Sequence, residues 1–110
     1  MVASDNYVEV TPPISGGQLF ITPFSTYDNF PQPSGSGQIY YDVGSTPLIA
    51  VLVDVEEIRN ATNRLDASLD TSTTATNFAA NVITVVALST GVLRIWNRTT
   101  GNRQFKLVFV

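Results

Sequence analysis

Carboxylates are the side chains of this sequence best suited to chemistry, and they are few. Asp54, Glu56 and Glu57 form the only cluster along the chain. Asp54 and Glu56 would share one face of a strand, which suits general acid–base catalysis or a metal ion. Asp66 and Asp70 are spaced so that a helix would place them on one face. Neither group has a further acidic ligand nearby, so we favour a solvated strand end, or partners for the basic strands, over catalysis or a metal site.

The absence of cysteine and histidine excludes several classes of site. The 110 residues contain no Cys and no His, which rules out disulfides, Cys/His zinc sites and every Ser-His or Cys-His triad. The glycine-rich stretches 15–17 and 34–37 lead into no Gly-Lys-Ser/Thr helix start, so both are interpreted as turns rather than phosphate loops. We therefore expect a protein that is not an enzyme, with no catalytic residues, no cofactor and no metal.

The composition is that of one globular, β-rich domain, residues 1–110. Hydrophobic residues make up 44% and charged residues 14% of the chain, which allows a core to form. The net charge of −3 argues against general nucleic-acid binding. No apolar run reaches the roughly 18–20 residues of a membrane span. We accordingly expect no nucleic acid and no membrane among the partners.

The charge is divided unevenly along the chain. Residues 1–58 contain seven acidic and no basic residues, whereas residues 59–110 contain six basic and two acidic residues. The simplest interpretation is that the two halves attract each other within one fold. The alternative is head-to-tail contact between copies, or contact with another protein.

Short β-strands separated by polar turns account for most of the sequence. Strands are predicted over residues 7–10, 18–22, 38–43, 48–53, 82–88, 92–97 and 104–110. Residues 48–53 are apolar on both faces, which predicts a central strand covered on both sides. Apolar side chains at intervals of three and four predict a short helix or helical turn near residues 55–70.

The last thirty residues predict a three-stranded meander. Two three-residue turns, 89–91 and 99–101, end in Gly, as hairpin turns of this length require. This loop length sets Val85 opposite Ile95, and Ile95 opposite Phe105. One face of the meander is then wholly apolar and is predicted to face the core. It consists of Ile83, Val85, Ala87, Leu93, Ile95, Phe105, Leu107 and Phe109.

The opposite face of the meander is the first candidate for a partner-binding surface. It carries Arg94, Trp96 and Lys106 among four apolar side chains, and Trp and Arg are enriched among residues that dominate interface energies. In the predicted register Arg94 faces Lys106, and facing like charges are destabilising. Either the chain covers this face, with both cations reaching the acids of residues 54–57, or another protein or a second copy buries it.

Aromatic side chains between residues 25 and 41 complete the candidate contact surface. They are Tyr27, Phe30, Tyr40 and Tyr41.

In style the chain resembles small virion proteins of tailed bacteriophages, which share its lack of Cys and His, its Ser/Thr/Asn-rich turns and its β-meander. More narrowly, the Pro- and Gly-punctuated strands of residues 1–47 and the closing segments 92–97 and 105–109 are similar to head decoration proteins of the staple type found in epsilon15-like short-tailed phages. The resemblance implies a single-domain antiparallel β-sandwich, jelly-roll-like, on the outer surface of the virion capsid. There it would cement neighbouring subunits of the major capsid protein. The resemblance also implies dimer-like contacts between copies and supplies no catalytic residues.

Two other classes of protein stay open. A β-sandwich glycan-binding module of a phage fibre or secreted protein would need a shallow aromatic platform with adjacent Asp or Asn donors. A small enzyme built on residues 54–57 would need a pocket and perturbed carboxylates at that strand end.

Overall fold

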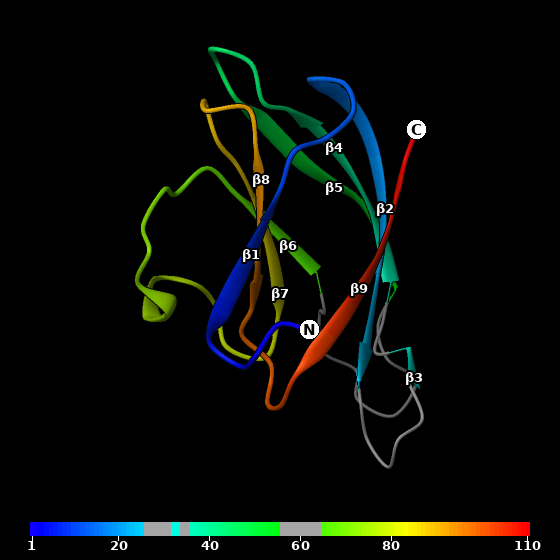
Figure 1. The fold of residues 1–110 in the computed structure, drawn as a ribbon, viewed down its shortest axis with the longest axis vertical. Helices are drawn as coiled ribbons and strands as arrows, with labels where there is room; N and C mark the ends of the chain where they lie inside the picture. The colour runs from blue at the N-terminus through cyan, green and yellow to red at the C-terminus, as the bar shows by residue number, and fades with distance from the viewer. Residues whose placement is uncertain (26–31, 34–35, 56–64) are drawn as a thin grey trace.

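Strands with alternating side-chain character build two β-sheets that face each other (Figure 1). The computed structural model describes residues 1–25, 32–33, 36–55 and 65–110. The four-stranded sheet has the order β1 (Asn6–Val10), β8 (Leu93–Asn97), β7 (Ile83–Ala87), β6 (Leu65–Ser68). The five-stranded sheet has the order β3 (Gln32–Pro33), β2 (Gly16–Ser25), β4 (Ser36–Asp42), β5 (Leu48–Val55), and β9 (Arg103–Phe109) pairs with the free side of β2. The predicted mainly-β, single-domain sandwich is thus confirmed.

The strand directions are mainly antiparallel. The exception among the described pairs is β6, which runs parallel to β7. The order of the described strands does not confirm the jelly-roll topology, which stays a prediction.

The hydrophobic core lies between the two sheets. From the five-stranded sheet it includes Leu19, Ile21, Ile39 and Tyr41. All eight side chains predicted for the core face of the meander belong to this core. Those of β7 and β8 are buried, and those of β9 are partly buried and pack against them. The alternation of apolar residues therefore predicted correctly which side chains point inward.

The predicted meander is correct for its first two strands and wrong for its third. β7 and β8 form the expected hairpin, with Val85 opposite Ile95. The turn that contains Gly101, which has a φ of 85°, then leads the chain to the other sheet. Ile95 faces Val8 of β1 on its second side, so the predicted pairing of Ile95 with Phe105 is wrong. The apolar face of β9 covers the same core from the five-stranded sheet. The alternation of side chains alone does not show which of the two sheets a strand joins.

Residues 48–70 also differ from the predictions. β5 is not central: among the described strands it pairs with β4 alone and stands at the edge of the sheet, with Leu48 and Leu52 about half exposed. Of the predicted helix, residues 65–68 form β6 instead, because Leu65 is buried in the core and the strand pairs with β7. Residues 56–64 lie outside the described part of the chain.

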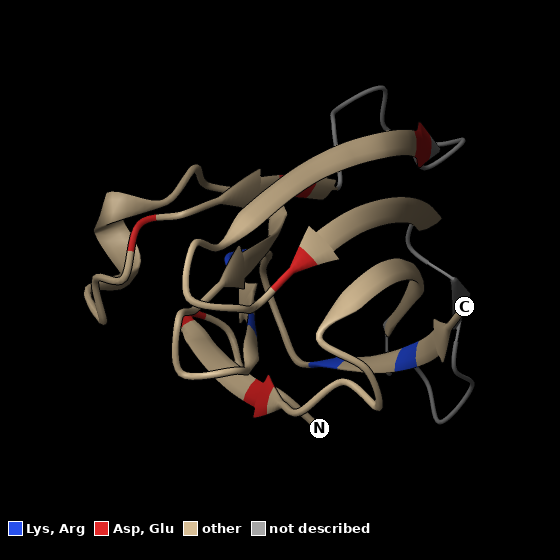
Figure 2. Cartoon of the chain, turned by 90° about the horizontal axis from the view of Figure 1, so that it is seen from above, with Lys and Arg blue, Asp and Glu red and all other residues tan. Residues whose placement is uncertain are grey.

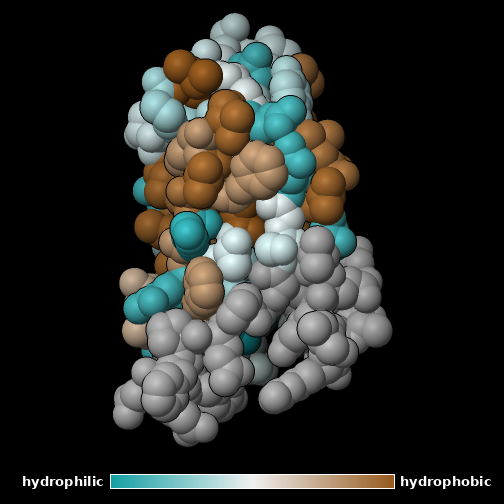
Figure 3. Space-filling view, turned by 90° about the vertical axis from the view of Figure 1, so that its right-hand side faces the viewer, coloured by the Kyte–Doolittle hydropathy of each residue, from teal (hydrophilic) through white to brown (hydrophobic). Residues whose placement is uncertain are grey.

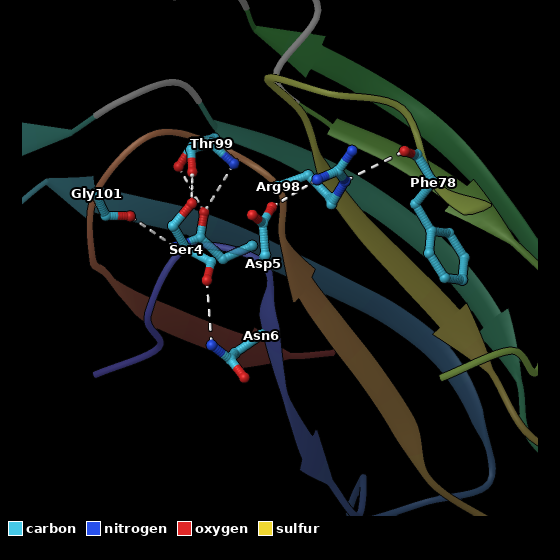
Figure 4. Close-up of polar contacts among 8 residues, drawn as sticks. Ser4, Asp5, Asn6, Phe78, Arg98, Thr99 and Gly101 are labelled. Carbon is cyan, nitrogen blue, oxygen red and sulfur yellow. Dashed lines mark hydrogen bonds and ion pairs between the residues drawn. The ribbon is translucent and has the colours of Figure 1, made fainter. Parts of the chain in front are cut away.

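The first six residues are attached to the turn that follows β8 (Figure 4). Ser4 Oγ donates a hydrogen bond to the carbonyl of Thr99 at 2.6 Å, and the amide of Asp5 donates to the carbonyl of Asn97 at 2.7 Å. Arg98 binds the Asp5 carboxylate at 2.6 Å and also donates to the carbonyl of Phe78 at 3.2 Å. These contacts fix the N-terminal residues against both β8 and the segment that precedes β7.

Asn97 is the buried centre of this attachment. Its amide nitrogen donates to the carbonyls of Val2 and Gly101 at 2.9 and 3.0 Å. Its carbonyl oxygen accepts from the amide and hydroxyl of Thr99 at 3.0 and 2.5 Å. The side chain is fully buried, so each of these groups loses water when the protein folds.

Replacement of Asn97 by alanine is expected to lower the free energy of unfolding by about 3 kcal/mol, since buried polar groups would lose their partners. Chemical denaturation followed by circular dichroism measures this change. Replacement of the exposed Asn102 by alanine is the matched control and should change stability little. An Asn97→Ala variant with the midpoint of the wild type would show that the network is not stabilising.

Candidate partner-binding surface

Trp96 lies on the predicted face of β8, but the chain itself covers that face. Trp96 is 2% exposed. Its ring packs against Tyr7 of β1, with ring centroids 4.7 Å apart, and against Phe78, at 5.1 Å. Phe78 follows the short 3₁₀ helix η2 (Ala75–Asn77) in the segment between β6 and β7. Of the two alternatives for this face, the structure therefore shows coverage by the chain itself at Trp96. The expected contact of Arg94 with the acids of residues 54–57 is wrong, because its acidic partner is Glu9 of β1.

Arg94 is also buried, at 8% exposure, and its partners belong to the same chain. Its guanidinium lies 3.6 Å from the Glu9 carboxylate, donates to the carbonyl of Thr71 at 3.1 Å and sits 4.6 Å from the centre of the Tyr7 ring. Arg94 faces Glu9 in the strand register. The predicted clash with Lys106 does not occur, because Lys106 lies in the other sheet opposite Thr22 of β2.

Two ion pairs account for part of the uneven charge of the sequence. Arg94 with Glu9, and Arg98 with Asp5, each join the basic second half of the chain to the acidic first half. Acidic and basic residues are spread over the described strands rather than gathered on one side (Figure 2). The predicted attraction between the halves within one fold is confirmed for these two pairs.

The remaining candidates separate into three groups. Tyr41 is buried in the core, and its hydroxyl donates to the carbonyl of Ile14 at 3.2 Å. Tyr40 and Lys106 are exposed on the outward side of the five-stranded sheet. Tyr27 and Phe30 lie outside the described residues. The structure thus brings Tyr40 and Lys106 onto one surface and buries Tyr41 and Trp96. Arg94 is largely buried as well, but it also lines a groove at the β7–β8 turn.

Burial raises the pKa of the Tyr41 hydroxyl above its ordinary value of 10.0. As pH rises, Tyr41 loses its proton in the unfolded chain before it does so in the folded protein. The stability contributed by the protonated Tyr41 hydroxyl is therefore complete below pH 10 and is lost as pH rises through the folded-state pKa. We expect the free energy of unfolding to fall more steeply above pH 10 in the wild type than in Tyr41→Phe, which has no proton to lose. Urea unfolding measured at several alkaline pH values tests this, and identical slopes would contradict it.

Exposed hydrophobic side chains gather on the outward side of the five-stranded sheet, which we call the outer face. They come from β2, β4, β5 and β9 and are 41–53% exposed: Phe20, Tyr40, Leu48, Leu52, Val53 and Val108. Figure 3 looks toward the right-hand side of Figure 1, where this sheet lies, and shows hydrophobic residues gathered on the described part of that side. This surface is on the side of the sandwich away from the segment that covers Trp96.

The strand register arranges the outer face in rows. Val108, Phe20, Gln38 and Val53 follow one another across β9, β2, β4 and β5. A shallow groove of about 280 Å³ runs beside this row and is lined by Phe20, Gln38 and Val53 among others. The amide of Gln38 donates to the side-chain carbonyl of Gln18, and the three hydrophobic side chains of the row are exposed. The arrangement suits contact with another apolar surface.

Sequence reasoning missed Phe20 and Val53 as surface residues. It did place Val108 on the outward face of the predicted meander, because Val108 stands between the inward-facing Leu107 and Phe109, and the structure confirms that Val108 is exposed. Phe20 has the same relation to Leu19 and Ile21.

Comparison with protein-family models, curated proteins and solved structures gives no match for this chain. Over the residues that the structure describes, no three His, Cys, Asp or Glu side chains come together as a metal site would require. Within the same ranges, no helix has the length and hydrophobicity to cross a membrane.

Proposed function

We propose that this chain is a non-enzymatic virion structural protein that attaches to the outside of a bacteriophage capsid. In this proposal it stabilises contacts between subunits of the major capsid protein. The outer face of the five-stranded sheet is the observation that carries the proposal, because it exposes six large hydrophobic side chains on adjacent strands. Contiguous exposed apolar surface of this kind marks sites of protein–protein interaction.

The composition of the outer face supports attachment to a protein surface. Tyr40 and Phe20 supply aromatic groups, which are enriched at the centre of protein interfaces. Lys106 stands at the β9 side of the face, where it can form the polar rim that surrounds such a centre. The edge strand β5 extends the surface through Leu48 and Leu52, whose side chains would otherwise remain in water.

The mechanism follows from mass action. A protein that binds the assembled shell more tightly than separated subunits stabilises the shell by its binding free energy. Repeated copies on one particle add their separate contributions, so a modest contact is sufficient. Contacts between neighbouring copies of this chain belong to the same proposal and would link the individual attachments through multivalency.

The proposal is tested by mixing the purified protein with shells assembled from candidate major capsid proteins. We expect the protein to sediment with its cognate shells and to raise the temperature at which they disrupt. Shells that were first saturated with unlabelled protein serve as the control for specific attachment. A folded protein that sediments with none of the shells, and leaves their disruption temperature unchanged, would overturn the proposal.

A further inference from the structure

A second concave surface belongs to the four-stranded sheet rather than to the outer face, and it lies beside the β7–β8 turn. It is a groove of about 550 Å³ between the end of β1, the β7–β8 turn and the segment that follows β6. Leu88 and Val92 contribute hydrophobic surface, and the polar lining consists of Glu9, Thr11, Thr71, Ser89, Thr90 and Arg94. The volume lies within the range of roughly 300–1,000 Å³ that is typical of small-molecule sites.

The two charged groups of the groove form a pair that retains hydrogen-bonding capacity. Nη2 of Arg94 lies 3.6 Å from Oε2 of Glu9, which is an ion-pair distance but too long for a direct hydrogen bond. Nη1 of Arg94 is directed to the carbonyl of Thr71. The Glu9 side chain is 42% exposed, so its oxygens remain open to a ligand. A hydroxyl group placed here would accept from the guanidinium and donate to the carboxylate.

Two of the hydroxyl-bearing residues of the groove, Ser89 and Thr90, stand on a well-defined turn. The β7–β8 turn that carries Ser89 and Thr90 is closed by a hydrogen bond from the amide of Leu88 to the carbonyl of Val92 at 3.1 Å. Gly91 supplies the positive φ of 90° that this turn needs. On the opposite wall, Arg94 binds the backbone at Thr71 directly. A site held in this way loses little conformational entropy when it binds a ligand.

We infer that this groove binds a neutral, polyhydroxylated ligand of the saccharide class. The charges of Arg94 and Glu9 cancel, so the site offers no net attraction to an anion. Hydroxyl groups both donate and accept, which matches a lining that combines a guanidinium, a carboxylate and several Thr and Ser hydroxyls. Leu88 and Val92 offer apolar surface to the C–H groups of a sugar ring. The inference is independent of capsid attachment, because it concerns a different surface.

The experiment is a titration of the ¹⁵N-labelled full chain with glucose, galactose, N-acetylglucosamine and their disaccharides, followed by amide and Arg side-chain NMR signals. Sodium acetate is the anionic comparison. We expect at least one saccharide to shift the signals of Thr90, Gly91 and Arg94 in a saturable manner. If no saccharide shifts these signals, or if only acetate does, the inference is overturned.

Two variants separate ligand binding from folding. Glu9→Gln keeps the shape of the side chain but removes its charge, and it should weaken saccharide binding about ten-fold. Thr90→Ala changes an exposed hydroxyl in the groove and should also weaken binding. Thr100→Ala, on the exposed turn after β8, is the matched control and should bind as the wild type does. If both groove variants are folded, as their NMR spectra would show, and bind the saccharide with unchanged affinity, the groove is not the binding site and the inference is overturned.

Discussion

Replacement of Trp96 by alanine is expected to lower the free energy of unfolding by about 3–5 kcal/mol, the usual cost of removing a large buried aromatic side chain. The indole is 2% exposed and packs between Tyr7 and Phe78. Its removal would leave a cavity under the segment that connects β6 to β7. Urea unfolding monitored by circular dichroism measures the loss.

Two comparisons distinguish this structural role from a role in partner binding. Trp96→Phe should recover most of the stability, because among the described residues the indole nitrogen has no hydrogen-bond acceptor. Tyr40→Ala, which changes an exposed ring on the outer face, should alter stability by less than about 1 kcal/mol. Wild-type stability in Trp96→Ala, together with weaker attachment to shells, would instead place Trp96 at the partner surface.

The sequence was sufficient to predict local pairing and the direction of side chains. The three-residue turn that ends at Gly91 fixes the β7–β8 register, and the observed pairing of Val85 with Ile95 follows from it. The apolar faces of β7, β8 and β9 point to the core as the alternation predicts. Both properties depend on neighbouring residues and on a two-residue period, which are readable along the chain.

The alternation of apolar residues could not predict which of the two sheets β9 joins. An alternating strand buries its apolar face equally well from either layer of a sandwich. The predicted register did indicate that β9 does not pair with β8, because it placed Arg94 opposite Lys106 and facing like charges are destabilising. In the structure Arg94 faces Glu9 and Lys106 faces Thr22, so both cations avoid the clash. The choice depends on contacts with β1 and β2, which are distant in sequence.

The burial of the candidate residue Trp96 was unpredicted for a related reason. Phe78 is separated from Trp96 by an intervening strand and turn, and it lies in a segment rich in polar residues. Nothing local predicts that this single aromatic covers the face of β8. Conversely, the apolar pattern of β5 predicted burial on both sides, whereas the described structure leaves Leu48 and Leu52 at the outer face.

Replacement of Phe20 by lysine is expected to weaken attachment to cognate shells by about a hundred-fold or more, because it places an unpaired charge at the centre of the apolar row. The side chain is 42% exposed and points away from the core, so the variant should remain folded. Sedimentation of labelled protein over a range of shell concentrations measures the affinity.

Leu69→Lys provides the matched control for this substitution. Leu69 is a similarly exposed hydrophobic residue, at 51%, but it directly follows β6 of the four-stranded sheet. It should tolerate the charge without loss of attachment. The reverse result, in which Leu69→Lys detaches and Phe20→Lys binds normally, would assign attachment to the opposite side of the sandwich.

The most direct test of the outer face as the attachment surface is hydroxyl-radical labelling of side chains in the free and shell-bound protein. In the free protein Phe20, Tyr40 and Val108 are exposed and should be modified. On the shell these three should become protected, whereas Tyr7 and Leu69, which belong to the other sheet and its covering segment, should keep their labelling. Protection of Tyr7 and Leu69 with continued modification of Phe20 and Tyr40 would contradict the account.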